Sequence, residues 1–277
     1  MKVAIMGAGA YGRALGAVAR RVGHATKFFD PFVFPERKLV DVLSWAEVIL
    51  LVTPAGAVEK LLKQFPAEAY QKPLIVATKG VMNLENYEKF GKFELISGPG
   101  FAEEILHGDR AKLTVATAGA TAMKTLAEEI FKGEQITFDK TEDVRGVAIL
   151  SGLKNIFAIE AGRREILKGE EEFKEYIFQV LEEAQKVLIF NGGFLETARL
   201  SAGVVDFVLT CGSEMSRNYQ FGQVLKTRNG WARREFLREN TVEGVFAAEE
   251  IRRCGLAIPR ELEILPDILR RIYAIKR

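Results

Sequence analysis

The sequence predicts an α/β domain with a doubly wound, mostly parallel sheet, followed by an all-α helical domain. Over the first half of the chain, short apolar runs alternate with helix-length segments. Runs that are apolar on both faces are typical of parallel strands covered by helices on both sides. Beyond about residue 140, long segments with a 3.6-residue period follow, and no strand is expected among them. We therefore expect one domain at 1–140 and a second at 141–277.

The expected strands are short runs such as VAIM, VILLV and LIVAT, separated by helical patterns. They fall at residues 3–6, 25–30, 48–52, 74–78, 93–97, 113–117 and 135–139. A glycine-rich loop and a helix at about 10–22 follow the first of them. In the second domain, helices are expected at 141–161, about 170–190, 196–210, 231–254 and 259–275.

Composition narrows the class of protein. The 277-residue chain has a formal net charge of +2, so nothing in its charge points to nucleic acid or to a membrane surface. No apolar run approaches the roughly 18 residues that a membrane-spanning helix needs. The two cysteines, Cys211 and Cys254, form no CxxC pair and are expected to be reduced thiols. We expect a cytoplasmic protein without a metal site.

A glycine motif follows the first expected strand and opens a helix. Gly7, Gly9 and Gly12 fit the pattern G-x-G-x-x-G. In that pattern the first glycine allows a tight turn, the second lets a pyrophosphate approach, and the third lets helix and strand pack closely. Glycine clusters also form plain turns, but the position after the first strand favours a Rossmann-type dinucleotide site. Ala10 and Tyr11 lie within this loop, at a helix N-terminus that attracts phosphates.

An acidic residue ends the second expected strand. Asp30 lies 18 residues after Gly12, where a carboxylate can bond a ribose 2′-hydroxyl and repel a 2′-phosphate. This favours NAD over NADP. Alternatively, Asp30 is a cap before Pro31, and Arg37 or Lys38 reaches a 2′-phosphate, in which case NADP is the cofactor.

Three further loops follow strand ends, the edge where ligands bind in such sheets. Thr53 and Pro54 end one strand and precede a helix, and Lys79 lies just past another. The stretch SGPG, with Gly98 and Gly100, makes a tight turn before a helix. A single lysine at a strand end is usually a solvated surface charge, which is the alternative for Lys79. The alternative for the SGPG stretch is a plain connection between a strand and a helix.

The most apolar expected helix carries two polar residues. Lys154 and Asn155 interrupt the stretch VAILSGLKNIFAIEAG at 147–162. An unpaired buried ammonium is very costly, so Lys154 must reach water or be held in a polar pocket.

These elements together resemble the NAD(P)-dependent sn-glycerol-3-phosphate dehydrogenase family, which reduces dihydroxyacetone phosphate to sn-glycerol 3-phosphate. The resemblance runs from residue 7 to about 244, and its most specific part is LKN followed some fifty residues later by SRN. The matching stretches, in the family's order, are GAGAYG, VTP, ATKG, ISGPGFAEE, GVAILSGLKNIFAIEAG, DFVLTCGSEMSRNYQFG and TVEG.

The resemblance implies catalytic roles for three residues. Lys154 would be the catalytic lysine facing the substrate, with Asn155 beside it. Lys79 would approach both the substrate and the nicotinamide. Asp206 would orient Lys154 or bond a substrate hydroxyl, with Thr210 nearby. Taken alone, Asp206 is as well explained as a helix cap.

The remaining implied contacts concern the phosphate and the cofactor. Ser216, Arg217 and Asn218 would hold the substrate phosphate, and a guanidinium fork suits that group. Arg217 would also touch the cofactor; otherwise it is a surface ion pair. The resemblance places Gly98 and Gly100 in the substrate pocket, and Ala102 and Glu243 at the cofactor. Without the resemblance, Glu243 would be interpreted as a helix cap.

Three departures from the family pattern bear on the substrate. Family members commonly have Thr where this chain has Gly100. The Asn-Ala-Arg/Lys run that usually follows the lysine helix is replaced by EEFKEYIF, where only Lys174 keeps the positive charge. The glycine-rich connection before that run is replaced by RREILKGEE.

The expected function is reversible hydride transfer between NAD(P)H and dihydroxyacetone phosphate, linking carbohydrate to glycerophospholipid metabolism. One alternative is a related two-domain dehydrogenase acting on another hydroxy or keto substrate. The other is a nicotinamide-binding protein that has lost catalysis. The apolar stretches VFAAEEI and ILPDILRRIYAI are compatible with a homodimer, although such stripes are more often core.

Overall fold

The structure, a computed structural model, describes residues 1–80, 83–118, 124–133, 135–227 and 229–275. The chain divides into two compact units. The sheet unit comprises Met1–Lys79 and Leu84–Val144, and the helical unit comprises Gly80–Asn83 and Arg145–Arg277.

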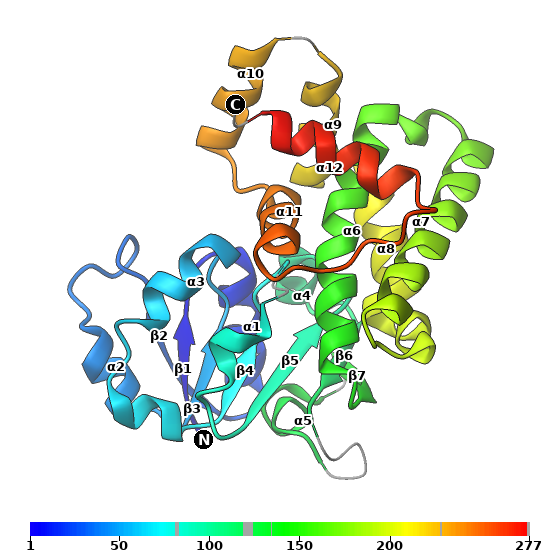
Figure 1. Cartoon of the computed structure of the whole chain (residues 1–277). Coiled ribbons are helices and arrows are strands. Elements are labelled where there is room, and N and C mark those ends of the chain that lie inside the picture. The colour runs from blue at the N-terminus through cyan, green and yellow to red at the C-terminus, as the bar shows by residue number, and fades with distance from the viewer. Residues whose placement is uncertain (81–82, 119–123, 134, 228, 276–277) are drawn as a thin grey trace. The chain divides into compact units, whose positions relative to one another are not determined.

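Within the described residues, seven strands form one sheet in the order β2-β1-β3-β4-β5-β6-β7 (Figure 1). Neighbouring strands are parallel except at the β5–β6 pair, which is antiparallel. β1 lies between β2 and β3, so the strand order reverses there, and dinucleotides bind beside such a reversal. The strands are β1 Lys2–Met6, β2 Ala25–Phe29, β3 Val48–Leu51, β4 Leu74–Val76, β5 Phe93–Ser97, β6 Ala111–Ala116 and β7 Ile136–Thr141.

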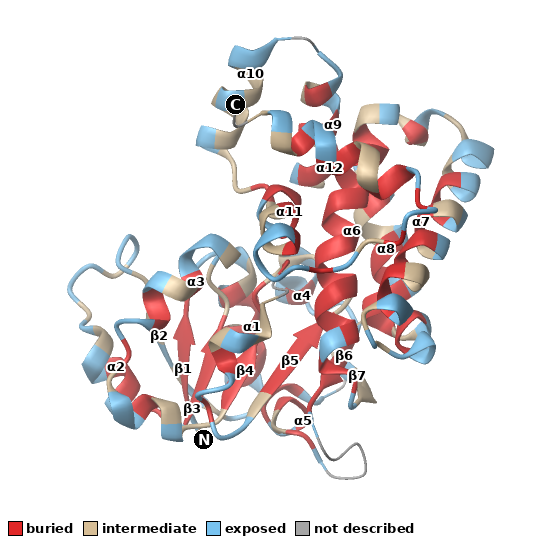
Figure 2. Cartoon of the chain, in the orientation of Figure 1, coloured by how far each residue is buried: buried red, intermediate tan, exposed pale blue. Residues whose placement is uncertain are grey.

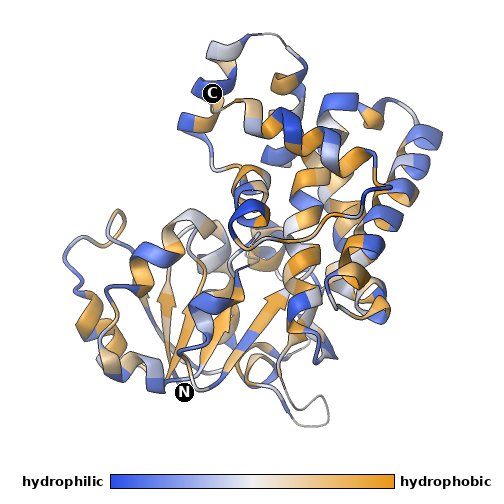
Figure 3. Ribbon diagram, viewed as in Figure 1, coloured by the Kyte–Doolittle hydropathy of each residue, from blue (hydrophilic) through white to orange (hydrophobic). Residues whose placement is uncertain are grey.

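Both faces of the central strands are buried. Val3 and Ile5 of β1 pack in one cluster with residues of α1, α4 and α5. The alternate residues Ala4 and Met6 point to the other face and are also fully buried. The central strands β1, β3 and β4 are accordingly hydrophobic along most of their length (Figure 3). The helices of this unit are α1 Ala10–Arg21, α2 Leu39–Trp45, α3 Ala55–Leu62, α4 Ala102–His107 and α5 Leu126–Phe131, with short 3₁₀ turns at η1 Ala67–Gln71 and η2 Leu84–Tyr87.

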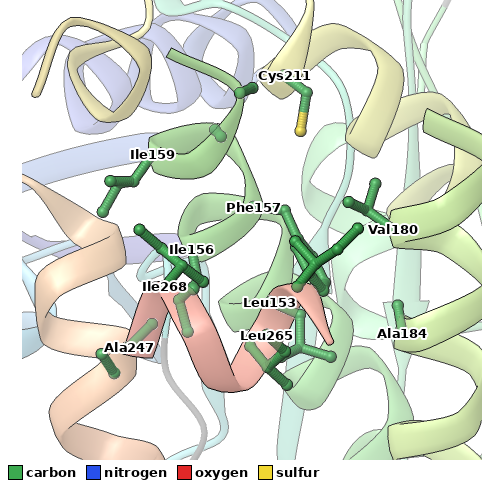
Figure 4. Close-up of a cluster of buried hydrophobic side chains, with 14 of the residues drawn as sticks. Leu153, Ile156, Phe157, Ile159, Val180, Ala184, Cys211, Ala247, Leu265 and Ile268 are labelled. Atoms are coloured by element: carbon green, nitrogen blue, oxygen red, sulfur yellow. The ribbon is translucent and has the colours of Figure 1, made fainter. Parts of the chain in front are cut away.

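The helical unit is built around α6. This helix is buried along most of its length (Figure 2), and apolar side chains of its neighbours surround it (Figure 4). The helices are α6 Val144–Arg164, α7 Glu170–Phe190, α8 Asp206–Cys211, α9 Arg217–Lys226, α10 Gly230–Glu239, α11 Glu243–Arg253 and α12 Ile264–Ala274. Shorter turns are η3 Ile166–Lys168, η4 Leu195–Arg199 and the π-helical η5 Ser201–Val205. The predicted fold class, a Rossmann-type sheet followed by helices, is confirmed.

Several predicted helix boundaries are wrong. The helix expected at 196–210 is broken into η4, η5 and α8, because Leu200 is extended (φ −73°, ψ 171°) and Gly203 has non-helical angles of φ −93° and ψ −115°. The helix expected at 231–254 is divided into α10 and α11. The prediction also missed α9, which lies between the helices expected at 196–210 and 231–254. It begins after the Ser216 cap.

Glycines let α6 cross α9 and α11 with their backbones in contact. A Cβ on Gly222 of α9 would lie 2.0 Å from the carbonyl oxygen of Ile159 in α6. A Cβ on Gly244 of α11 would lie 2.5 Å from the carbonyl oxygen of Asn155, also in α6. No side chain fits at either crossing, so these glycines set the helix spacing.

A buried carboxylate fixes the start of α12. Glu183 of α7 accepts the backbone N–H groups of Glu263, Ile264 and Leu265 at 2.7–2.8 Å. These donors have no partner inside their own helix, and a negative charge is favourable at a helix N-terminus. The contact therefore joins two helices that lie about eighty residues apart in sequence.

No helix among the described residues is long and apolar enough to cross a membrane. Likewise, the described part of the chain holds no group of three or more His, Cys, Asp or Glu side chains arranged to bind a metal ion. Cys211 is buried and Cys254 is exposed, and both are free thiols. Burial raises the pKa of Cys211 well above its usual range, so this thiol stays protonated.

Gly222→Ala is expected to lower the free energy of unfolding by roughly 1–3 kcal/mol, since the new Cβ collides with backbone that cannot move aside. Chemical denaturation of the purified variant measures this loss.

Gly230→Ala is the matched control. Gly230 begins α10, and a Cβ there meets no atom within 4 Å. Its free energy of unfolding should stay within about 0.5 kcal/mol of the parent protein. Equal losses in the two variants would contradict the helix-crossing argument.

Candidate active site

The glycine loop of the sheet unit has the geometry that its motif predicts. Gly7 adopts φ +113°, a conformation that favours glycine, and a Cβ there would lie 2.9 Å from the carbonyl oxygen of Val52. A Cβ on Gly12 would lie 2.3 Å from the carbonyl oxygen of Gly7. At Gly9, by contrast, a Cβ would meet nothing within 4 Å. Packing therefore requires two of the glycines, whereas Gly9 leaves open space at the loop.

The surroundings of this loop fit a dinucleotide. α1 begins at Ala10, and no side chain caps its N-terminus, so its first N–H groups are available to a phosphate. Thr53 and Pro54 follow β3, the strand beside β1. The Thr53 hydroxyl is buried and has no hydrogen-bond partner among the described residues. A buried polar atom without a partner is costly, which is consistent with a ligand that supplies one.

Asp30 is anchored by three backbone N–H groups. Its Oδ2 accepts from Ala8 in the glycine loop at 2.9 Å, and its Oδ1 accepts from Phe32 at 3.0 Å and from Val33 at 3.3 Å. The capping role weighed for Asp30 is therefore present, and the carboxylate is also tied to the loop. Arg37 donates to the carbonyl oxygen of Phe28 at 3.0 Å and stacks on Phe34.

Lys79 lies beyond the end of β4 and contacts the glycine loop. Its Nζ lies 5.0 Å from the ring centroid of Tyr11, within the range of a cation–π interaction. Two elements predicted to contribute to the site, ATKG and GAGAYG, are thus neighbours in the sheet unit.

In the loop after β5, close packing requires a glycine at position 98. Gly98 has φ +149°, and a Cβ there would lie 3.0 Å from the Cα of Leu113. A Cβ on Gly100 would lie 3.2 Å from the flexible end of Ile105 and 3.7 Å from Ala111 Cβ. Ala102 begins α4, directly after this loop.

Lys154 lies in the middle of α6 and forms an ion pair with Asp206. Both residues are buried, with exposed fractions of 4% and 2%. The Lys154 Nζ donates a hydrogen bond to Asp206 Oδ2, and the Thr210 hydroxyl donates to Asp206 Oδ1 at 3.3 Å. The alternative that Lys154 extends to water is wrong. Asp206 is the first residue of α8, and its carboxylate pairs with this ammonium.

Ser216, Arg217 and Asn218 begin α9 and have different environments. The Ser216 hydroxyl accepts the N–H of Tyr219 and caps the helix. Arg217 is exposed and makes neither a hydrogen bond nor an ion pair with any residue that the structure describes. Asn218 is buried, and both ends of its amide are bonded within the protein. Glu243 begins α11.

Three residues near this group were missed by the sequence analysis. Gly244 donates its N–H to Asn218 Oδ1 at 2.9 Å, and Ser151 accepts both from Asn155 and from Gly80. Ser151 precedes Asn155 by four residues, so the helical period would have placed it on the same face. For Gly80 and Gly244, no sequence signal indicates these partners.

Two cavities in the helical unit lie away from these residues. One, of about 200 Å³, is lined by Leu225, Arg233, Arg271 and Ala274. The other, of about 390 Å³, is lined mainly by residues of the segment 164–179, which includes the departure from the family pattern. Neither is lined by a predicted site residue.

Sequence comparisons give the family of the chain. Residues 143–276 match the family model described as NAD-dependent glycerol-3-phosphate dehydrogenase C-terminus. Glycerol-3-phosphate dehydrogenase [NAD(P)+] of Agrobacterium fabrum is 30% identical over 226 residues, which cover 78% of this chain and 68% of that protein. The protein of the same name from Nitrosomonas eutropha is 27% identical and covers 99% of this chain and 93% of its own length.

Solved structures show the same fold. Glycerol-3-phosphate dehydrogenase of Coxiella burnetii superposes with a TM-score of 0.80 at 22% identity, over 98% of both chains. The enzyme of Saccharomyces cerevisiae gives 0.76 at 18% identity, over 99% of this chain and 96% of that one. With the glycine loop and the Lys154–Asp206 pair in place, the matches along the chain show that it belongs to the NAD(P)-dependent glycerol-3-phosphate dehydrogenase family.

Proposed function

We propose that this protein catalyses reversible hydride transfer between NAD(P)H and dihydroxyacetone phosphate, with sn-glycerol 3-phosphate as the reduced product. The buried Lys154–Asp206 pair carries the proposal, because it holds an ammonium in a fixed place, as stabilising the charge that develops on a ketone oxygen requires. The names of the curated relatives support the substrate. Because the product is the backbone of glycerophospholipids, we also propose that it feeds their synthesis.

The dinucleotide, when bound, supplies or accepts the hydride. The glycine loop and the N-terminus of α1 would hold its pyrophosphate, where backbone N–H groups and the positive end of the helix dipole attract anions. The unpartnered Thr53 hydroxyl would bond the same ligand. Ala102 and Glu243, which begin α4 and α11, are proposed as further cofactor contacts.

Lys154 is proposed to act on the ketone oxygen of the substrate. Hydride addition at C2 leaves negative charge on that oxygen, and the ammonium would stabilise the charge and deliver a proton. Asp206 would hold the ammonium in one orientation, while Thr210 in turn holds Asp206. Lys79, placed against Tyr11, would provide a second positive charge.

Arg217 is proposed to bind the substrate phosphate. It is exposed, begins α9 and has no partner in the described residues, so its five N–H donors are free to meet an anion. The Ser216 hydroxyl lies beside it in sequence, and the adjacent helix N-terminus adds a favourable dipole. Gly98 and Gly100, in the loop between β5 and α4, are proposed to line the pocket of the three-carbon substrate.

The first experiment mixes purified protein with dihydroxyacetone phosphate and follows oxidation of NADH by absorbance. We expect rapid oxidation by the parent protein, and Lys154→Ala should lower kcat about 10²–10⁴-fold because the charge on the ketone oxygen loses its stabilising group. NADH binding should persist.

Two controls accompany this assay. Lys186→Ala removes a half-exposed lysine of α7 that pairs with Glu182 on the same helix, and it should leave kcat unchanged. The double variant Lys154→Met/Asp206→Asn removes both buried charges, so it should fold even if Lys154→Ala leaves Asp206 unpaired. Retained turnover in a folded Lys154 variant would exclude Lys154 from the mechanism, and NADH binding without oxidation would point to another ketone substrate.

Arg217→Ala should raise KM for dihydroxyacetone phosphate about 10–100-fold, since charge-assisted hydrogen bonds contribute about 1.5–3 kcal/mol. The dissociation constant for NADH should change much less. Steady-state kinetics and NADH fluorescence titration measure the two quantities. Arg238→Ala, on the exposed face of α10, is the control and should change neither. An unchanged KM in Arg217→Ala would contradict the phosphate assignment.

We propose NAD as the preferred cofactor, because the Asp30 carboxylate is fixed where the second strand ends and would repel a 2′-phosphate. Asp30→Asn should raise the affinity for NADPH relative to NADH about tenfold or more, given the size of a Coulomb term between nearby charges. Parallel titrations with the two dinucleotides measure the ratio.

Asp41→Asn removes the same charge from an exposed position on α2 and should leave the ratio unchanged. If Asp30→Asn also left the ratio unchanged, or if the parent protein preferred NADPH, the assignment of Asp30 would be wrong.

A further inference from the structure

Two arginines from different helices line one cavity of the helical unit. The cavity, of about 200 Å³, is lined by Leu225 of α9, Arg233 of α10, and Arg271 and Ala274 of α12. Its volume is several times the roughly 30 Å³ that one water takes up in the liquid, so it has room for a small anion. Its walls offer two guanidinium groups and two apolar side chains to one ligand. We call it the arginine cavity.

Arg233 uses only one of its three side-chain nitrogens. Its Nη2 donates hydrogen bonds to the carbonyl oxygens of Leu225, at 2.9 Å, and of Thr227. These carbonyl groups lie at the C-terminus of α9, where a positive charge is favourable, so this nitrogen caps the helix. Nε is buried without a partner in the part of the chain that the structure describes, and Nη1 makes no hydrogen bond there either. Capping thus explains one nitrogen and leaves two unsatisfied.

The residues around the arginine cavity carry more positive than negative charge. Asp267 of α12 accepts a hydrogen bond from Arg271 Nε at 2.8 Å and pairs with Arg270 at 3.5 Å. The hydrogen bond from Arg271 lowers the pKa of Asp267, so this carboxylate is ionised at neutral pH. Arg233 forms no ion pair with a described residue, and the two Nη atoms of Arg271 make no hydrogen bond with one. Three guanidinium groups therefore share one carboxylate.

Little buried surface holds α10 in place. None of its residues 230–239 is buried, and Figure 1 shows this helix at one end of the helical unit, beside α9. Phe236 packs on Phe221 of α9 with ring centroids 5.6 Å apart, and Arg233 bonds the end of the same helix. A segment with few buried groups opens locally at a low free energy. An anion that bridges α10 and α12 would raise that free energy.

We propose that the arginine cavity binds a phosphate group, either as inorganic phosphate or in a small phosphate monoester. Arg233 Nη1 and the Nη atoms of Arg271 donate to its oxygens, because guanidinium groups match the geometry of phosphate and keep their charge. A phosphate carries nearly two negative charges and three strong acceptor oxygens, so two guanidinium groups suit it better than a carboxylate. Leu225 and Ala274 contact the carbon atoms of a monoester.

The arginine cavity is separate from the proposed substrate site. Arg217, the proposed contact of the substrate phosphate, begins α9, whereas Arg233 bonds the other end of that helix. α9 has ten residues, so its two ends are about 15 Å apart. The phosphate site therefore does not rest on the proposed function, and its test needs no turnover.

Isothermal titration calorimetry with inorganic phosphate tests the proposal. The series uses Arg217→Ala as its background, which lacks the proposed substrate contact, and potassium chloride keeps the ionic strength constant. We expect saturable binding. Arg271→Gln in this background should raise the dissociation constant about tenfold or more, since it removes a charge-assisted hydrogen bond. Arg233→Gln should do the same, but it also removes the cap of α9, so Arg271→Gln decides if the other variant does not fold.

Arg234→Gln and Arg270→Gln are the matched controls. They remove guanidinium groups from the same two helices, and neither side chain lines the cavity. Salt screens exposed charges, so both variants should keep the dissociation constant within about twofold. Absence of saturable binding, or equal losses in the Arg270→Gln and Arg271→Gln proteins, would overturn the proposal.

Hydrogen–deuterium exchange locates the bound phosphate. Inorganic phosphate should slow exchange of the amides of α10, because binding adds free energy to a helix that otherwise opens locally. Arg271→Gln should abolish this slowing, although Arg271 belongs to α12. If phosphate protects other segments and leaves α10 unchanged, the cavity is not the site and the proposal is wrong.

Two further titrations identify the chemistry of the occupant. Acetate should bind at least about tenfold more weakly than phosphate, because it has a single charge and two oxygens. Equal binding of acetate would contradict the choice of phosphate. Glycerol 2-phosphate then distinguishes the two sources of the phosphate group. Binding as tight as that of inorganic phosphate shows that the apolar wall accepts carbon atoms, whereas much weaker binding restricts the site to inorganic phosphate.

Discussion

The ion pair between Lys154 and Asp206 is the interaction on which the helical unit depends. A buried ammonium is tolerated only when a carboxylate and further hydrogen bonds compensate for lost hydration. The carboxylate comes from the first turn of α8, and the break at Gly203 allows α8 to begin there. The apolar side chains around α6 in Figure 4 exclude water from the same helix. Stable packing favours apolar residues in α6, whereas the proposed chemistry needs a charged one. The ion pair with Asp206 allows that charge to lie among apolar side chains.

Backbone contacts decide how closely the functional segments approach each other. In the helical unit, glycines let α9 and α11 touch α6, and this closeness lets the buried amides of Asn155 and Asn218 meet. In the sheet unit, Gly7 and Gly12 bring the loop after β1 against its own helix and against β3, and Asp30 fixes the loop from the neighbouring strand. In both units, segments that carry charged side chains with a proposed ligand-binding role have closely packed backbones.

Much of the architecture could be predicted because it is encoded locally. Apolar runs flanked by turns gave all seven strands to within a few residues, since strand periodicity and turn chemistry act over a few positions. The helices after α7 were predicted less well. Gly203 breaks a segment whose hydrophobic pattern alone favours one helix, and the Ser216 cap that begins α9 is a single residue in a polar stretch. Single residues of this kind carry a weaker signal than an amphipathic pattern repeated over several turns.

The sequence by itself determined the fold class, the glycine loop and the presence of a lysine in an apolar helix, because each follows from the spacing of residues along a short stretch. The family resemblance already implied that Asp206 orients Lys154, but no local pattern joins two residues 52 positions apart, and the tertiary structure shows that they form a buried ion pair. It also decided that Asn155 and Asn218, 63 residues apart, bond each other, and that Asp30 ties strand to loop. Such partners are selected by how whole helices and strands pack, and no local pattern records that choice.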